Sequence, residues 1–309
     1  MDKQSTTQKN ADEIELALIL KIIWNKKKNL FFSSLVVSSL AALISLTLPN
    51  IYTSKSILAP AQTNESLSNI ASRFSGMASI AGFSIPKTEV DKVAMGIEVI
   101  KSYDFYVDLI KDNNLFFKLQ AVKGWDQETN SLVVNNKIFD QDKNLWISED
   151  EFSVNGVPSI QESHIAFLEN LDISVNNSNG LVTISYEHYS PYVAQEVVVH
   201  IINRINTISM QEDIKIAQKT IDYLQIEVEK TQLNDVRLAI NNLIEKQIET
   251  ISLAQASPEY LLKTLSSPIA PELKTSPKRS VIVILVGLFT GFVGTMFFIF
   301  QHMRSIRNE

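Results

Sequence analysis

The stretch VIVILVGLFTGFVGTMFFIF, Val281–Phe300, decides the fold class, because it is an apolar run without a charged residue near the end of a 309-residue chain. Its length is close to the ~20 residues that an α-helix needs to cross the hydrocarbon core of a membrane. A second uncharged run, LFFSSLVVSSLAALISLTL, occupies Leu30–Leu48 near the other end. The sequence therefore predicts a membrane protein with one transmembrane helix near each end.

A cleaved signal peptide is the alternative explanation for Leu30–Leu48. About 29 residues precede this run, and the residues that follow it, Pro49–Tyr52, offer no small-residue cleavage site. We therefore predict an uncleaved anchor.

Positive charge around the first run predicts the orientation. Lys26–Lys28 directly precede it, whereas only Lys55 lies close behind it. Cytoplasmic flanks carry the excess of Lys and Arg, so the N-terminus is expected in the cytoplasm. Lys278–Arg279, before the second run, contradict this rule, but long translocated segments obey it poorly. We therefore infer the orientation from the charges that flank the first run. This places both termini in the cytoplasm and residues 49–280 on the outer side.

The predicted fold class is an α+β membrane protein with a membrane-proximal α/β domain and a long helical hairpin between the two transmembrane helices. The expected segments are a cytoplasmic N-terminus at 1–29, transmembrane helices at 30–48 and 281–300, the α/β domain at 49–190 completed by 257–280, the hairpin at 191–256, and a cytoplasmic tail at 301–309.

Apolar spacing within the α/β segment predicts individual elements. Ile51–Leu58 alternates like a half-buried strand, whereas Thr63–Ser84 has weakly amphipathic helical spacing and Thr88–Asn113 has the spacing of two helices. From Leu115 to Leu181 the pattern shortens to strand-sized pieces. Asp172–His188 contains two alternating runs around an Asn/Ser/Gly turn, which predicts a β-hairpin.

A long helix is predicted from Ser190-Pro191, where a capping hydroxyl precedes a proline at the first helical position. No further proline or glycine occurs before Ala256. About 65 residues of unbroken helix would extend about 100 Å. We therefore predict a reversal into an antiparallel hairpin, within Lys230–Ile240, where Asn and Asp favour a turn.

The sequence contains no constellation that supports catalysis. It has no cysteine and no glycine-rich phosphate loop, and its histidines lack metal-ligand spacing. Asp140–Glu151 places acidic and amide side chains at several positions of a calcium-binding loop, but Leu145 stands where that loop requires glycine. A solvated acidic turn is the simpler interpretation. We expect no enzyme activity, no metal, no cofactor and no nucleic-acid partner.

Two features near the second run are candidate functional sites. Gly287, Gly291 and Gly294 fall near one helical face, where small residues let membrane helices approach closely. Their expected role is packing against another transmembrane helix or a polymerase. The other feature is a proline motif before the membrane, and its residues are Pro268, Pro271, Pro277, Lys278 and Arg279.

These motifs and the layout resemble the Wzz-type polysaccharide co-polymerases, the chain length determinants of O-antigen and related surface polysaccharides. The resemblance rests on Leu48–Pro60, which follows the first run, and on Asn241–Gly294, which contains the proline motif and the glycines. It implies a two-pass protein of the bacterial inner membrane with a periplasmic middle segment. It also implies a homo-oligomeric ring that works beside an integral-membrane polysaccharide polymerase, with lipid-linked polysaccharide as a further partner.

The function expected from the resemblance is non-enzymatic control of O-antigen or lipopolysaccharide chain length. A co-polymerase for capsule or exopolysaccharide export is the alternative within the same superfamily. A periplasmic sensor and an export adaptor are the alternatives of another class. Only Gln301–Glu309 follow the second run, so we expect no signalling or kinase domain on this chain.

Overall fold

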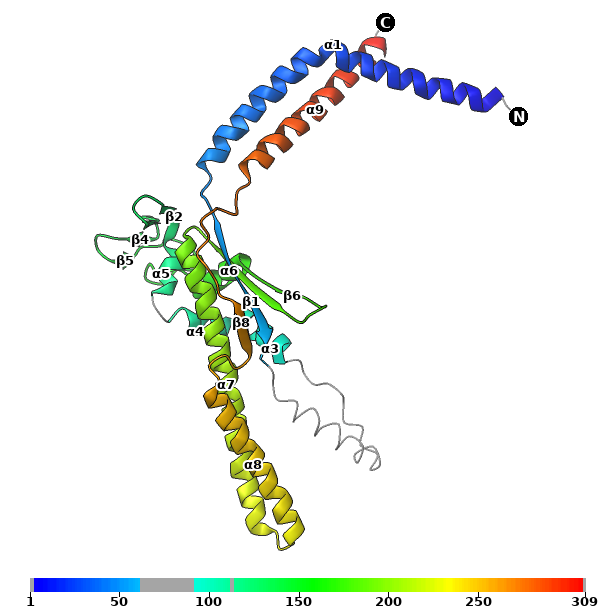
Figure 1. Ribbon diagram of the computed structural model, residues 1–309. Helices are drawn as coiled ribbons and strands as arrows, with labels where there is room; N and C mark the ends of the chain where they lie inside the picture. The colour runs from blue at the N-terminus through cyan, green and yellow to red at the C-terminus, as the bar shows by residue number, and fades with distance from the viewer. Residues whose placement is uncertain (1–2, 62–91, 112–113, 308–309) are drawn as a thin grey trace. The chain divides into compact units, whose positions relative to one another are not determined.

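The computed structural model describes residues 3–61, 92–111 and 114–307, with the backbone alone for parts of the two terminal helices. These residues form two compact units, one made of the chain ends, Met1–Asn50 with Thr275–Glu309, and one made of the middle, Ile51–Lys274. Helices and antiparallel sheet occur together, which confirms the predicted mixed fold class (Figure 1).

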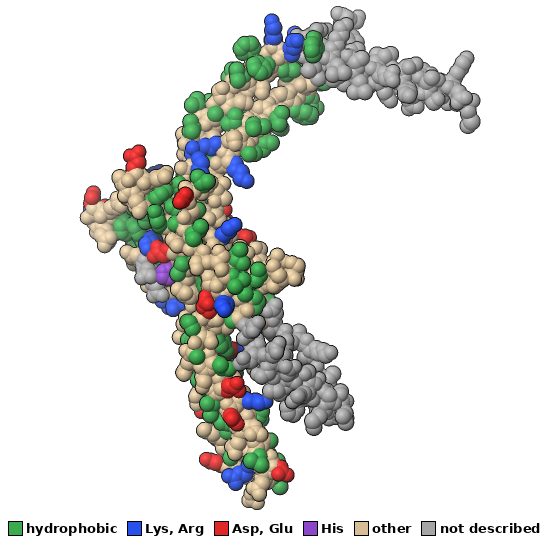
Figure 2. Space-filling view, in the orientation of Figure 1, with side chains coloured by type: hydrophobic (Ala, Val, Ile, Leu, Met, Phe, Trp, Pro, Cys, Tyr) green, Lys and Arg blue, Asp and Glu red, His purple; other side chains and the backbone are tan. Residues whose placement is uncertain are grey.

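The unit of the chain ends contains two long helices, α1 (Lys3–Thr47) and α9 (Arg279–Arg307), which pack side by side. Their apolar parts, Lys26–Thr47 and Arg279–Gln301, are long enough to cross a membrane. The side chains of these parts are largely exposed and hydrophobic (Figure 2). Two apolar terminal helices are therefore confirmed, although α1 begins well before the predicted run.

The middle unit is built on a four-stranded antiparallel sheet in the order β6-β7-β1-β8. Its strands are β6 (Leu171–Val175), β7 (Val182–His188), β1 (Tyr52–Pro60) and β8 (Leu262–Ser266). Val175 pairs with Val182, so β6 and β7 form the predicted hairpin. β1 is the central link, because it pairs with β7 on one side and with β8 on the other.

The buried face of β1 includes two serines instead of a continuous apolar row. Ser54 and Ser56 are almost fully buried between Tyr52 and Leu58. The Ser54 hydroxyl donates to the Ile269 carbonyl at 2.8 Å, and the Ser56 hydroxyl donates to the Ser266 carbonyl at 2.7 Å. Since buried polar groups need such partners, these bonds fasten the chain at and after β8 to the sheet.

Helix α7 (Pro191–Lys230) packs against β1 and β7 with its first half. The core combines apolar residues of this half with inward residues of the sheet and with α3 (Lys92–Lys101) and α4 (Tyr103–Leu109). α3 and α4 are the two helices predicted within Thr88–Asn113. The predicted helical spacing at residues 63–84 lies outside the described residues.

The predicted helical hairpin is also present. α7 ends at Lys230, and α8 (Asn234–Ala256) returns beside it after a short link (Figure 1). The break lies inside the range predicted for it. One detail was wrong, because the Ser190 hydroxyl makes no capping bond at the start of α7. Instead, the Ser190 backbone N–H donates to Nδ1 of His188 at 3.0 Å.

The region from Leu115 to Leu181 is the largest departure from the sequence prediction. It contains two helices, α5 (Leu115–Gln120) and α6 (Ile160–Asn170), in addition to short strands. The strands before α6 are β2 (Val122–Asp126), β3 (Ser131–Val134), β4 (Phe139–Asp140) and β5 (Leu145–Trp146). Ser159 caps α6 by accepting the N–H of Glu162 at 3.4 Å. This Ser-x-x-Glu spacing is a helix-start signal that the strand interpretation overlooked.

Candidate functional site

The predicted glycine face on α9 lies partly against α1. A Cβ atom at Gly287 would approach Ser38 Oγ to 2.6 Å, and one at Gly294 would approach Leu30 Cδ2 to 2.7 Å. Both distances are shorter than real contacts allow, so a side chain at either position would displace its neighbour on α1. The displaced atom is the hydroxyl of Ser38 at Gly287 and the flexible end of Leu30 at Gly294. Gly291 differs, because no described atom outside its own helix backbone lies within 4 Å of its Cβ position.

Serines of α1 form the other side of this contact. The Ser34 hydroxyl donates to the Gly287 carbonyl at 2.8 Å, and Ser38 lies over the same glycine. Ser34 and Ser38 are four residues apart, which places them on one helical face. The Ser-x-x-x-Ser spacing of Ser34 and Ser38 is a small-residue signal that is readable in the sequence.

The residues of the proline motif contact different parts of the chain. The Pro268 carbonyl accepts a hydrogen bond from the Gln195 side chain at 2.9 Å, and Pro271 lines a hollow described below. Pro277 and Lys278 directly precede α9. Arg279 begins α9, and its guanidinium donates to the Leu48 carbonyl and to Asn50 Oδ1, both at 3.1 Å. The bases were predicted as one group, but Lys278 is exposed while Arg279 joins the ends of the two long helices.

The helical hairpin carries many exposed apolar side chains beyond the sheet. Ile216, Tyr223 and Ile226 on α7 are all at least half exposed. On α8 the exposed large apolar residues are Val236, Leu238, Leu243, Ile248 and Leu253. These side chains alternate with charged residues along both helices (Figure 2). A surface of this kind can bury apolar area against another molecule.

The acidic segment Asp140–Glu151 contains the end of β4, a turn at residues 141–144, β5 and the residues that follow it. One Asp140 carboxylate oxygen accepts the backbone N–H groups of Asp142 and Lys143, both at 3.1 Å. These bonds and the nearby Lys143 side chain lower the pKa of Asp140. Among the described residues, no group of His, Cys, Asp and Glu could hold a metal ion.

His188 is a buried titratable group near the base of the hairpin. Its Nε2 donates to the Lys118 carbonyl at 3.1 Å, and its Nδ1 accepts the Ser190 N–H, so the neutral ring satisfies both partners. Burial lowers the pKa of His188 to about 4. The side chain therefore holds α5 and the start of α7 together and has no exposed nitrogen for chemistry.

The other histidines that the structure describes make separate contacts. His164 Nε2 lies 2.9 Å from the Lys101 carbonyl, and His200 Nε2 lies 3.8 Å from a carboxylate oxygen of Glu196. The side chain of His302 is not among the described ones. The structure brings no two of the described histidines together.

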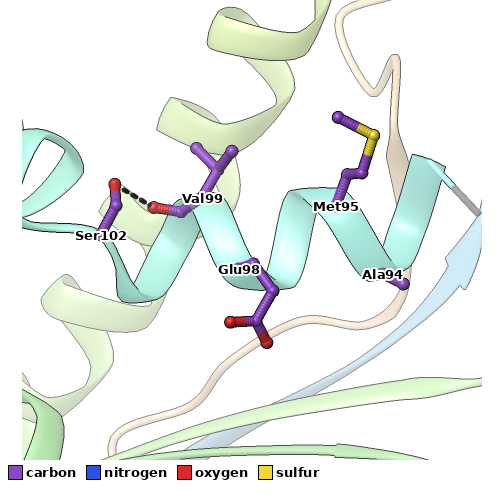
Figure 3. A pocket seen from close by; sticks show the side chains of 5 residues that line it. All are labelled: Ala94, Met95, Glu98, Val99 and Ser102. Carbon is purple, nitrogen blue, oxygen red and sulfur yellow. Dashed lines mark hydrogen bonds between the residues drawn. The ribbon is translucent and has the colours of Figure 1, made fainter.

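A shallow hollow of about 500 Å³ lies on the exposed face of α3 (Figure 3). It is lined by Ala94, Met95, Glu98, Val99 and Ser102. The Ser102 hydroxyl already has a local partner, because it donates a hydrogen bond to the Val99 carbonyl at 2.7 Å. Met95 is 55% exposed. The lining is largely apolar and presents no pair of groups for acid–base or nucleophilic chemistry.

Comparison with known proteins gives one family match and several distant structural neighbours. Residues 12–112 match the family described as Wzz: chain length determinant protein. This segment includes the first apolar helix, β1 and the helices α3 and α4, so the resemblance noted from the sequence is confirmed over this part. No curated protein matches the chain.

Three solved structures that are similar to this chain are remote from it in sequence. A full-length bacterial polysaccharide co-polymerase is 16% identical, with 94% of this chain and 97% of that chain covered and a TM-score of 0.37. A fragment of WzzB, a polysaccharide co-polymerase from Salmonella Typhimurium, is 13% identical, with 74% and 100% covered and a TM-score of 0.27. A mutant of a Shigella flexneri lipopolysaccharide O-antigen chain-length regulator is 13% identical, with 72% and 99% covered and a TM-score of 0.18. These scores are too low to carry an argument.

Proposed function

We propose that the protein controls the length of a surface polysaccharide such as O-antigen, because residues 12–112 match the chain length determinant family Wzz. The match is the observation that carries the proposal. Two apolar terminal helices support it, because control of a membrane-bound polymerisation requires a protein held at the membrane. The action is non-enzymatic: the protein biases when a lipid-linked chain stops growing.

The working form in this proposal is a homo-oligomeric ring. The exposed apolar side chains of α7 and α8 support it, since they would be covered by the hairpins of neighbouring copies. Aromatic and aliphatic residues at the centre of an interface, with charged residues at its rim, are typical of protein contacts. A ring of long hairpins would then set polysaccharide length through geometry.

The proposed location is the bacterial inner membrane, with both termini in the cytoplasm and residues 49–280 in the periplasm. Lys26–Lys28 at the start of the first apolar stretch support this orientation. The segment boundaries proposed from the sequence remain 30–48 and 281–300 for the spans and 191–256 for the hairpin.

The polymerase or a sister chain contacts α9 in this proposal. Gly287 and Gly294 face α1 of the same chain, so the accessible part of the glycine face is Gly291 and its neighbours. The proline motif supplies an extended connection into α9, because each proline fixes its backbone and cannot continue a helix.

The decisive experiment is deletion of the gene and restoration with a plasmid copy, followed by gel analysis of the lipopolysaccharide ladder. We expect deletion to abolish the modal length and the plasmid copy to restore it. An unaltered ladder would exclude O-antigen length control. A simultaneous change in capsule or exopolysaccharide would then identify the alternative co-polymerase role.

A second experiment tests α9 itself. Gly291→Leu should leave the helix pair intact but change the modal length, whereas Gly287→Leu should separate α1 from α9 and reduce the amount of folded protein. If Gly291→Leu, alone and with Gly287→Leu, leaves both polysaccharide length and oligomer mass unchanged, the proposed role of this face is wrong.

A further inference from the structure

A second hollow, of about 550 Å³, lies in the middle unit where the start of α7 meets the β2–β3 hairpin and the chain after β8. We call it the Trp125 hollow. It is lined by Trp125, Gln127, Asn130, Pro191, Tyr192, Ala270, Pro271, Glu272 and Leu273. Its volume is within the range of small-ligand sites, which combine apolar walls with a few polar groups.

The aromatic wall of the hollow is held in place. Trp125 stacks edge-on against Tyr52, with ring centres 5.5 Å apart, and against Tyr192 at 6.0 Å. Tyr52 is 5% exposed and belongs to the central strand β1, so it provides a rigid support. The indole N–H of Trp125 donates to Asn130 Oδ1 at 3.0 Å. A ligand that stacks on this wall would therefore lose little affinity to side-chain ordering.

The rim of the hollow offers both donors and acceptors of hydrogen bonds. Asn130 is exposed and uses its side-chain oxygen for Trp125, so its amide N–H groups are the donors that it can offer a ligand. Gln127 and Glu272 are exposed, and within the described part of the chain their side chains take part in no hydrogen bond or ion pair. Gln127 can donate and accept, whereas the ionised Glu272 only accepts.

A sugar ring fits this combination of groups. Each hydroxyl of a sugar both donates and accepts a hydrogen bond, while the C–H groups of the ring form an apolar face that packs on aromatic side chains. The carboxylate of Glu272 would repel an acidic sugar. We propose that the Trp125 hollow binds a neutral or amino-sugar segment of the polysaccharide whose length the protein controls, an inference that rests on the proposed function.

A lipid surface is the other occupant to consider, because Leu273 is 84% exposed and aromatic residues are common at membrane interfaces. Insertion of this patch into lipid would also bury Glu272, Gln127 and Asn130. Burial of an unpaired carboxylate and of unsatisfied amides is unfavourable. The polar rim therefore favours the polysaccharide over the membrane.

The test uses the fluorescence of Trp125 in the full chain, reconstituted in lipid nanodiscs. Trp24→Phe and Trp146→Phe leave Trp125 as the single tryptophan, since the chain has three. The probes are the surface polysaccharide of the producing cells, released from its lipid by mild acid, and dextran as an unrelated neutral polymer. We expect a saturable change in Trp125 emission with the cells' own polysaccharide.

Two variants should weaken that binding about tenfold, namely Tyr192→Ala, which removes part of the aromatic wall, and Glu272→Gln, which removes the charge at the rim. Tyr223→Ala is the matched control, because Tyr223 is 63% exposed on the outer part of the hairpin and its loss should leave binding unchanged. Calorimetric titration of the chain with all three tryptophans, with and without Tyr192→Ala, gives the same comparison if the single-tryptophan chain does not fold.

Three results would overturn the inference: no response of Trp125 to the polysaccharide, equal binding by the Tyr192→Ala variant, or strong quenching of Trp125 by brominated lipids, which would place the patch in the membrane. A failure of this inference can be distinguished from a failure of the proposed function. If gene deletion alters polysaccharide length but Trp125 does not respond, only the hollow is wrongly assigned. If Trp125 responds but deletion leaves length unaltered, the sugar site stands and length control is wrong.

Discussion

The two halves of α7 share a helical spacing of apolar residues but differ in their surroundings. From Pro191 to Asn206 the helix buries an apolar face completely, with Val197, Ile201 and Ile205 at 0% exposure. Beyond Ile216 the same three- and four-residue spacing continues, but Ile226 is 51% exposed and Tyr223 is 63% exposed. Ala217 and Ile221 are nevertheless buried in this second half. The chain therefore covers the apolar face of the first half completely and that of the second half only in part.

This difference separates two kinds of stability. The first half belongs to the core of the middle unit, where every lost methyl group leaves a cavity. The second half, with α8, is a two-helix hairpin whose exposed apolar residues contribute little until another molecule covers them. Substitutions at equivalent helical positions should therefore have unequal effects.

Ile201→Ala should give the largest effect. Ile201 lies in the core against the sheet, and truncation of such a side chain lowers the free energy of unfolding by about 2–5 kcal/mol. The matched control is Ile216→Ala on the exposed half, where a change below ~0.5 kcal/mol is expected. Urea unfolding followed by circular dichroism measures both. Equal losses of unfolding free energy in the two variants would show that the two halves of α7 do not lie in different environments.

The pH dependence of stability should be the next largest effect, and it belongs to the buried half. Because the folded-state pKa of His188 is about 4 and its unfolded value is 6.5, the unfolded chain binds more protons between these values. Stability should therefore fall as the pH drops from about 6.5 toward 4, by on the order of 3 kcal/mol.

Unfolding midpoints of the chain at pH 7.5 and pH 4.5 test this prediction. His188→Gln should flatten the difference, since glutamine does not titrate in this range. His164→Gln, at a histidine that is only partly buried, should retain it. If the His188→Gln variant loses as much stability between pH 7.5 and pH 4.5 as the unchanged chain, the effect belongs to other groups.

Asn206→Ala should lower the free energy of unfolding by less than the changes above, but by a large amount for a polar residue. The Asn206 side chain accepts the N–H groups of Leu261 and Leu262, both at 2.8 Å, and donates to the Leu262 carbonyl at 3.0 Å. Its removal leaves buried backbone groups without partners, which costs about 1–3 kcal/mol. Exposed Asn203→Ala is the control, and hydrogen exchange at β8 should increase only in the Asn206 variant.

The exposed half should show almost no change in stability when its apolar residues are replaced. Tyr223→Ser with Ile226→Ser should change the free energy of unfolding by less than ~0.5 kcal/mol per site. Oligomer mass in detergent, measured by light scattering, should nevertheless decrease. Glu229→Ser on the same helix is the control. Unchanged mass would mean that this half does not form the contact between copies.

Local patterns predicted the elements that depend on short stretches of sequence. The apolar runs located both terminal helices, and the Asn/Asp pair located the end of the hairpin within a few residues. The Asn/Ser/Gly turn located the β6–β7 hairpin. Each of these elements is specified by neighbours in the sequence, so composition and spacing were enough.

Long-range pairing could not be predicted in the same way. The position of β1 between β7 and β8 joins segments from three parts of the chain, and the burial of Ser54 and Ser56 follows from carbonyl groups more than 200 residues away. The Trp125 hollow depends equally on Tyr192, which is remote in sequence. For α5 and α6 the failure was different, because the capping signal at Ser159 was present and was outweighed by the short apolar spacing.

The antiparallel pairing of β1 with β8 has a mechanical consequence. The chain enters β1 from the first apolar helix and leaves β8 toward the second, so both connections start at the same end of one strand pair. A force that pulled the two connections apart would load the hydrogen bonds of this pair one after another, in the manner of a zipper. A force that displaced both connections in the same direction, along the strands, would load all the hydrogen bonds between β1 and β7 at once, in shear. The sheet would therefore yield to separation of its two tethers and resist their common displacement.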